Sequence, residues 1–191
     1  MPSPLAHIAV GCAIGDSAGR RSPHYWRILA ISVFFAMLPD IDAIPGILFR
    51  NIGKYHNQFT HSIFFGLAIC LLATPLVRLL LPEHSPKRIF GLLAACSGSH
   101  LLLDFFTHGG TGRLLFWPFH TSRFRAPLTI FNGLRWSAGL ISPAHLATLA
   151  NESVFVLALY LIIYLIREHN SREQGGGPDQ GDTDIRISQS R

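Results

Sequence analysis

A histidine and an aspartate stand four residues apart in the apolar stretch 99–107 of this chain, at His100 and Asp104. In an α-helix, residues i and i+4 lie one turn apart on the same face, so both side chains point the same way. Such a pair is typical of two metal ligands, or of a buried histidine bonded to an aspartate of its own helix. Ionisable groups are costly in an apolar segment, which favours a functional role.

More imidazoles and carboxylates stand at the ends of other apolar stretches. The candidate metal ligands are His7, Asp40, Asp42, His56, His61, His100 and Asp104, with Glu152 as a possible further ligand. Imidazoles and carboxylates without a thiolate suit zinc or manganese, as one ion or as two ions bridged by Asp40 or Asp104. Individually, some have simpler explanations: Asp40 and Asp42 can end a helix, and Glu152 suits a first helical turn.

A divalent ion in such a site activates water and neutralises charge on a transferring phosphoryl group, so phosphoester hydrolysis is the leading chemistry. Asp42 or His56 would take the proton from the water. Arg123 or Arg125 would hold the phosphate through paired hydrogen bonds, although both also suit contacts with lipid headgroups. Thr60 and Ser62 are better explained as helix caps than as nucleophiles.

The composition indicates a membrane protein. The chain has 191 residues, of which 49% are hydrophobic and 14% charged, and its mean hydropathy is +0.32; this is too apolar for an ordinary soluble domain. The net charge of +5 is spread over short basic clusters between apolar runs, a pattern typical of membrane-flanking residues and not of nucleic-acid binding. The chain has three cysteines, Cys12, Cys70 and Cys96. They are better explained as small buried hydrophobic residues than as a disulfide framework.

Apolar runs predict helices over residues 4–18, 26–38, 61–81, 89–106 and 152–166. The expected fold class is therefore all-α, a polytopic membrane bundle of four to five apolar helices. Residues 43–60 are expected to form a loop, and residues 107–150 a folded interfacial segment with Trp117, Phe119 and Trp136 near the headgroups. Residues 1–167 would form the membrane-embedded domain and residues 168–191 a disordered polar tail.

If each run crosses the membrane, the candidate ligands all fall on one side. His7 begins the first run, Asp40 ends the second, His61 begins the third and Asp104 ends the fourth. The basic residues predicted for the opposite side are Arg20, Arg21, Arg27, Lys87, Arg88, Arg167 and Arg172. By the positive-inside rule that side is cytoplasmic, which puts the site on the periplasmic or external face. The bias is reduced by basic residues on the site side, which are Arg50, Lys54, Arg113, Arg123, Arg125 and Arg135.

The ordered set of motifs resembles a known family. It consists of His7, L-P-D-I-D at 38–42, H-N-Q-F-T-H-S at 56–62, S-H-L-L-L-D-x-x-T at 99–107 and L-F-W-P-F at 115–119. Together, over residues 1 to about 166, these resemble the YdjM-type inner-membrane family of predicted metal-dependent hydrolases. The resemblance implies a helical protein of the bacterial inner membrane with a His/Asp metal site and hydrolase activity, distantly similar to zinc-dependent phospholipase C.

By position, all seven candidate ligands match polar motif residues of the family, and Glu152 falls where the family often has an acidic residue. Two departures stand out. Asn57 and Gln58 replace an Arg-Gly pair that is common in the family, which removes a possible phosphate-binding arginine, and His108 stands where proline is frequent.

The expected function is therefore metal-dependent hydrolysis of a phosphoester in a lipid or lipid-linked substrate, because the site would lie at headgroup level. The expected partners are membrane lipids and that substrate. One alternative is a metal or proton transporter, which needs polar residues through the whole depth of the bundle. Another is a non-catalytic protein stabilised by metal, in which the coordination would be closed.

Overall fold

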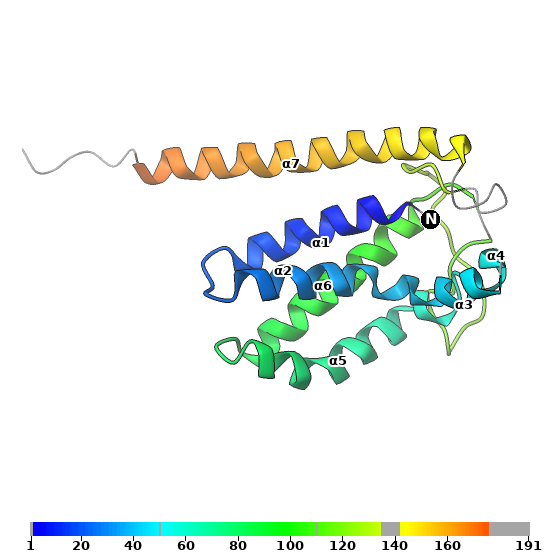
Figure 1. Cartoon of the computed structure of the whole chain (residues 1–191), viewed down its shortest axis with the longest axis horizontal. Coiled ribbons are helices and arrows are strands. Elements are labelled where there is room, and N and C mark those ends of the chain that lie inside the picture. Colours follow the sequence, from blue (N-terminus) through cyan, green and yellow to red (C-terminus); the bar gives the residue numbers. More distant parts are fainter. Residues whose placement is uncertain (1, 50, 110, 135–141, 176–191) are drawn as a thin grey trace, which may run out of the picture. The chain divides into compact units, whose positions relative to one another are not determined.

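The computed structural model describes residues 2–49, 51–109, 111–134 and 142–175, and in these residues the chain forms helices and no strand (Figure 1). This confirms the all-α class. In chain order the elements are α1 (Pro4–Gly19), α2 (Tyr25–Met37), η1 (Leu38–Asp42), α3 (Ala43–Leu48), α4 (Ile52–Tyr55), η2 (Phe59–His61), α5 (Ile63–Leu80), α6 (Pro86–Phe105), η4 (Pro143–His145) and α7 (Leu146–Gly175). The chain divides into two compact units, Met1–Val156 and Leu157–Arg191, and all candidate site residues belong to the first.

Among the described residues, four helical stretches are long and apolar enough to cross a membrane: Tyr25–Leu48, Ile63–Leu80, Pro86–Phe105 and Pro143–Glu173. Helix α1 has 16 residues. At about 1.5 Å per residue it is roughly 24 Å long, shorter than the hydrocarbon core of about 30 Å. The expected four to five apolar helices are therefore present.

Two predicted boundaries differ from the structure. The predicted loop 43–60 contains α3, α4 and the start of η2, all too short to show a periodic pattern in the sequence. Helix α7 starts before residue 152 and continues beyond Arg167, so residues 168–175 are helical and not part of a tail without structure. The i,i+4 pairs Arg172–Glu168 and His169–Glu173 support this polar end. Residues 176–191, like Arg50, Arg135 and Trp136, lie outside the described residues.

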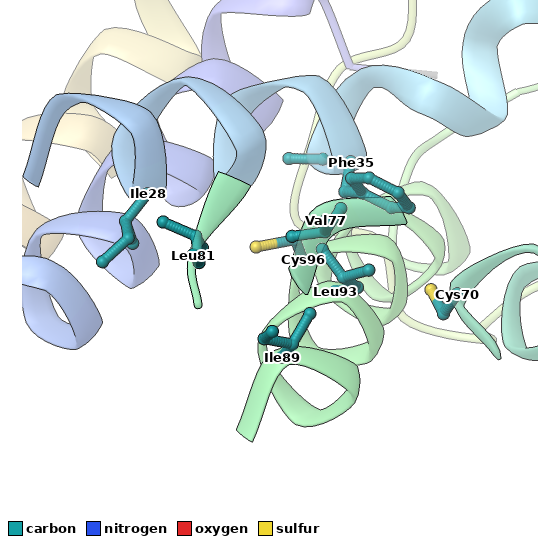
Figure 2. Packing of buried hydrophobic residues seen from close by; sticks show 9 residues of the cluster. Ile28, Phe35, Cys70, Val77, Leu81, Ile89, Leu93 and Cys96 are labelled. Carbon is teal, nitrogen blue, oxygen red and sulfur yellow. The ribbon is translucent and has the colours of Figure 1, made fainter. Parts of the chain in front are cut away.

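An apolar core joins α2, α5 and α6, as Figure 2 shows in close view. It consists of Ile28, Phe35, Ala36, Cys70, Val77, Leu81, Ile89, Leu93 and Cys96. All three cysteines of the chain are free, and Cys70 and Cys96 are buried in this core as small hydrophobes. Of the helices in this core, α6 carries His100 and Asp104, α2 leads into Asp40 and Asp42, and α5 follows His61. The core therefore packs together the helices that position these ligands.

Helices α1 and α2 approach each other closely at three glycines spaced four residues apart, Gly11, Gly15 and Gly19. A Cβ atom at Gly11 would lie 2.9 Å from Cβ of Ala36, and one at Gly15 would lie 2.9 Å from Cβ of Ser32. Small residues at this spacing let helix backbones pack tightly in a membrane, where van der Waals contact drives association.

The turn between α1 and α2 contacts the turn between α5 and α6. Nε2 of His24 lies 3.4 Å from Oε2 of Glu83, the hydroxyl of Ser22 donates to Oε1 of Glu83 at 3.2 Å, and Nη1 of Arg27 donates to the Leu80 carbonyl at 3.1 Å. The two helical hairpins therefore turn at the same end. It follows that the start of α1, the end of α2, the start of α5 and the end of α6 meet at the opposite end, as the alternation of apolar runs predicts.

Candidate metal centre

Four imidazoles and three carboxylates from five segments meet in the first unit, at the end of the helical hairpins opposite the α1–α2 and α5–α6 turns. His7 comes from α1, Asp40 and Asp42 from η1, His56 from the turn after α4, His61 from η2, and His100 and Asp104 from α6. All of them are buried except Asp40, which is partly exposed. The structure therefore brings together all seven residues that the sequence proposed as principal ligands.

Asp40 is the point on which three of the histidines converge. Its Oδ1 lies 3.3 Å from Nε2 of His100, 3.4 Å from Nε2 of His61 and 3.7 Å from Nε2 of His56. The Nε2 atoms of His61 and His100 are 3.4 Å apart. Atoms bound to one tetrahedral zinc at 2.0–2.1 Å are about 3.3 Å from one another, so this spacing fits ligands of a shared ion.

Asp104 extends the cluster towards α1. Its Oδ2 lies 3.4 Å from Nε2 of His61, and its Oδ1 lies 3.6 Å from Nε2 of His7. The rings of His7 and His100 stack with their centroids 3.8 Å apart. In the described part of the chain, two groups of residues have ligand atoms that all lie within 4.8 Å of one another. One group is Asp40, Asp42, His56 and His61, and the other is His7, His100 and Asp104. This arrangement suits one ion or two neighbouring ions.

Backbone and carboxylate acceptors fix the orientation of two of the rings. Nδ1 of His100 lies 2.7 Å from the carbonyl oxygen of Ala36 in α2. A carbonyl only accepts, so Nδ1 carries the hydrogen and the Nε2 lone pair faces Asp40. Nδ1 of His56 likewise lies 2.8 Å from Oδ1 of Asp42. Hydrogen bonds of this kind orient metal-binding histidines in known metal sites.

Asp42 is held by its own set of donors. Its Oδ2 accepts hydrogen bonds from the Thr60 hydroxyl at 2.7 Å and from the backbone N–H of Gln58 at 3.0 Å. Thr60 is therefore a partner of Asp42 and not a helix cap. Ser62 does cap α5, because its hydroxyl accepts from the N–H of Phe65 at 3.2 Å.

Several buried polar atoms of the cluster have no hydrogen-bond partner within the described part of the chain. They are both oxygens of Asp40, Oδ1 of Asp104 and both ring nitrogens of His7. Buried polar groups in folded proteins nearly always have a hydrogen-bond partner, so these unpaired atoms indicate that a ligand binds among them. A divalent cation among them would satisfy carboxylates and neutral imidazoles together, and the donor set fits such an ion.

The electrostatics of the centre also favour a cation. Burial lowers the pKa of His61, but its contacts with Asp104, Asp40 and Asp42 outweigh burial and raise this pKa well above its ordinary value. The three carboxylates therefore stabilise positive charge at the His61 ring.

Arg113 is a member of the centre that the sequence analysis did not assign to it. The side chain is 2% exposed, and its Nε donates to Oδ2 of Asp104 at 3.0 Å. Backbone hydrogen bonds of 2.8 and 2.9 Å with Phe124 hold Arg113 in place. Gly112 precedes it with a φ of +87°, and a Cβ there would lie 2.9 Å from the Phe124 carbonyl oxygen. The only available signal was an arginine in a glycine-rich turn shortly after Asp104.

The remaining predicted residues belong to neither group of ligands. Glu152 is fully buried and accepts from the backbone N–H of Ser3 at 2.5 Å and from the Ser3 hydroxyl, so it anchors the start of α1. Arg123 is exposed and donates to the carbonyls of Asn57 and Gly112 at 3.1 and 3.2 Å. Arg125 and His108 are exposed.

Apolar helices with a cluster of histidines and aspartates at one end define an integral membrane protein with a candidate divalent-metal site. The chain matches the family model described as YdjM inner membrane protein over residues 1–171, and it belongs to this family. The resemblance carried by the sequence motifs is thereby confirmed. Comparisons with curated proteins and with solved structures gave no match.

Proposed function

We propose that this protein is a membrane-bound hydrolase that uses one or two divalent metal ions, zinc or manganese, to cleave a phosphoester in a lipid or lipid-linked substrate. The observation that carries the proposal is the convergence of the Nε2 atoms of His56, His61 and His100 on Oδ1 of Asp40, beside Asp104. An ion held there would supply an activated water and stabilise charge on the phosphoryl group.

Asp40, His61, His100, Asp104 and His7 are the proposed ligands. His56 is the proposed general base: its Nε2 is the most distant of the three from Asp40 Oδ1, at 3.7 Å, and its Nδ1 is bonded to Asp42. In this arrangement Asp42 holds the imidazole in one tautomer and stabilises it after it takes the proton, as the aspartate of a catalytic triad does. Asp42 is then a positioning residue.

Arg113 is the proposed contact for the phosphate. Its Nε is taken by Asp104, while its Nη2 is buried with no hydrogen-bond partner among the described residues. A guanidinium donor of this kind suits a phosphate oxygen. Arg123 and Arg125, which are exposed, are assigned to contacts with lipid headgroups.

The family and the apolar helices support a location in the inner membrane, with lipid around the helices. We assign the site to the periplasmic face, because Arg20, Arg21, Arg27, Lys87 and Arg88 are at the end of the helical hairpins away from the centre. A site at the end of the membrane-crossing helices would lie at headgroup level, where lipid phosphates are.

Transport of metal ions or protons has less support. In α1 beyond His7, in α2, in α5 and in residues 86–99 of α6, no acidic, basic or histidine side chain is buried among the described residues. The apolar core occupies this depth instead. A pathway for ions would need polar groups there.

Elemental analysis of the purified, detergent-solubilised protein tests the metal centre. We expect one or two divalent ions per chain, which are lost in Asp104→Ala and kept in His108→Ala, the matched control at an exposed histidine. Hydrolysis of a soluble phosphodiester and of phosphatidic acid should stop on chelation and return when the metal found is added back. Full metal occupancy in Asp104→Ala would remove Asp104 from the ligands, and a protein inactive on both esters with its metal bound would refute the hydrolase.

A further inference from the structure

Helices α5 and α6 enclose an apolar groove of about 280 Å³. Its walls include Ile63, Leu67, Ala94, Gly98, Leu102 and Phe105. We propose that this groove binds one hydrocarbon chain of the lipid substrate whose phosphate lies at the metal centre. This inference rests on the proposed function and adds to it the part of the substrate that the protein recognises.

Along the helices, the groove begins at the level of the metal centre and runs away from it along α6. At its near end, Ile63 follows His61 by two residues, and Phe105 is next to Asp104. At its far end is Ala94. Residues 94 to 105 of a helix span about 16 Å, which is roughly half of the 30 Å hydrocarbon core. The groove therefore has the depth of one leaflet, measured from the level of the phosphate site.

The surroundings of the groove favour a lipid chain as its occupant. The groove lies on two of the membrane-crossing helices, and it is continuous with their lipid-contacting surface: Leu67 is 44% exposed and Leu102 57% exposed. A neighbouring helix is too wide for it, because a helix about 10 Å across and 16 Å long occupies more than about 1,000 Å³. A single hydrocarbon chain is narrow enough to enter the groove, and lipid chains of the membrane already surround this face.

Gly98 offers a way to fill the groove without disturbing the protein. A Cβ atom at Gly98 would meet no atom within 4 Å, so a larger side chain enters the open space of the groove. Gly91, also in α6, has the same freedom but is not part of the groove wall, which makes it the matched control. Both substitutions replace glycine inside a helix, where most residues are better helix formers.

The test labels the protein in phosphatidylcholine nanodiscs with phosphatidic acid that carries a diazirine on one acyl chain. In the wild-type protein we expect labelling of residues 94–105 that is saturable and is reduced at least tenfold by excess unlabelled phosphatidic acid. Gly98→Leu should abolish this saturable labelling, Gly98→Ala should weaken it, and Gly91→Leu should leave it unchanged. Labelling that cannot be competed, or that is equal in wild type and Gly98→Leu, overturns the proposal.

Hydrolysis measurements separate this proposal from the one on which it rests. Gly98→Leu should reduce cleavage of long-chain phosphatidic acid at least tenfold and leave cleavage of a soluble phosphodiester unchanged. Saturable labelling in a protein that cleaves neither ester would support the groove and refute the hydrolase. Cleavage of the soluble ester without saturable labelling would refute the groove alone. A loss of dimers in Gly98→Leu, measured by mass photometry, would assign the groove to a second copy and overturn the lipid chain.

Discussion

Nε of Arg113 donates a 3.0 Å hydrogen bond to Oδ2 of Asp104, and both side chains are almost completely buried. Asp104 is also within 3.6 Å of Nε2 of His7 and 3.4 Å of Nε2 of His61. The guanidinium therefore offsets part of the negative charge of the centre before any cation binds. The pair joins the segment after α6 to the last turn of α6 itself.

We predict that Arg113→Met lowers the free energy of unfolding by about 3–5 kcal/mol, because it leaves the Asp104 carboxylate buried without its partner. Chemical unfolding in detergent with the metal chelated measures this. The control is Arg20→Met. Arg20 forms an ion pair with Asp16 near the surface at the C-terminal end of α1, away from the centre, and this pair should contribute less than about 1 kcal/mol. An equal decrease in the free energy of unfolding in the two variants would show that the buried pair stabilises the protein no more than the exposed pair does.

The different contacts of Asp40 and Asp42 predict different effects on metal affinity. Asp40 faces three Nε2 atoms, whereas Asp42 accepts from His56, Thr60 and Gln58. Oδ2 of Asp42 also lies 3.3 Å from Nδ1 of His61, one of the proposed ligands. Asp42→Asn should therefore weaken metal binding about 10–100-fold, the usual effect of losing a partner that orients a ligand. Asp40→Asn should weaken it more. Competition with a chromophoric chelator measures both, and an Asp42 effect as large as that of Asp40 would make Asp42 a ligand.

Glu152 tests the distinction between an anchor and a ligand. Because it receives hydrogen bonds from the N–H and the hydroxyl of Ser3, Glu152→Ala should destabilise the protein by about 1.5–3 kcal/mol. The metal content should not change. Thermal unfolding and elemental analysis of the same sample give both values. Loss of metal from a folded Glu152→Ala protein would return Glu152 to the ligand set.

The close contact between α1 and α2 predicts an effect on the centre at a distance. A Cβ at Gly11 would lie 2.9 Å from Cβ of Ala36, and the Ala36 carbonyl orients His100. Gly11→Val should cost about 1–3 kcal/mol through overpacking. It should also weaken metal binding by moving that carbonyl. Gly91→Val, where a Cβ meets nothing within 4 Å, is the control. Unchanged metal affinity in a destabilised Gly11→Val protein would contradict the coupling.

The sequence by itself determined the class of the protein and which residues would meet. Apolar runs of sufficient length must cross the membrane as helices, because only a helix satisfies its own backbone polar groups in lipid. Successive crossings alternate in direction. Asp40, His61 and Asp104, at alternate ends of successive crossings, therefore had to lie on the same side. His7 joins them because α1 packs against α2 across a short turn.

Only the tertiary structure decided what each of these residues does. Asp42 and Asp40 are two residues apart and chemically identical, yet Asp42 bonds to His56 and Thr60 while Asp40 faces the Nε2 atoms. Arg113 belongs to a segment without periodicity, so nothing in the sequence predicted its burial against Asp104. Such roles depend on distances of a few ångströms between side chains far apart in the chain, and packing alone sets those distances.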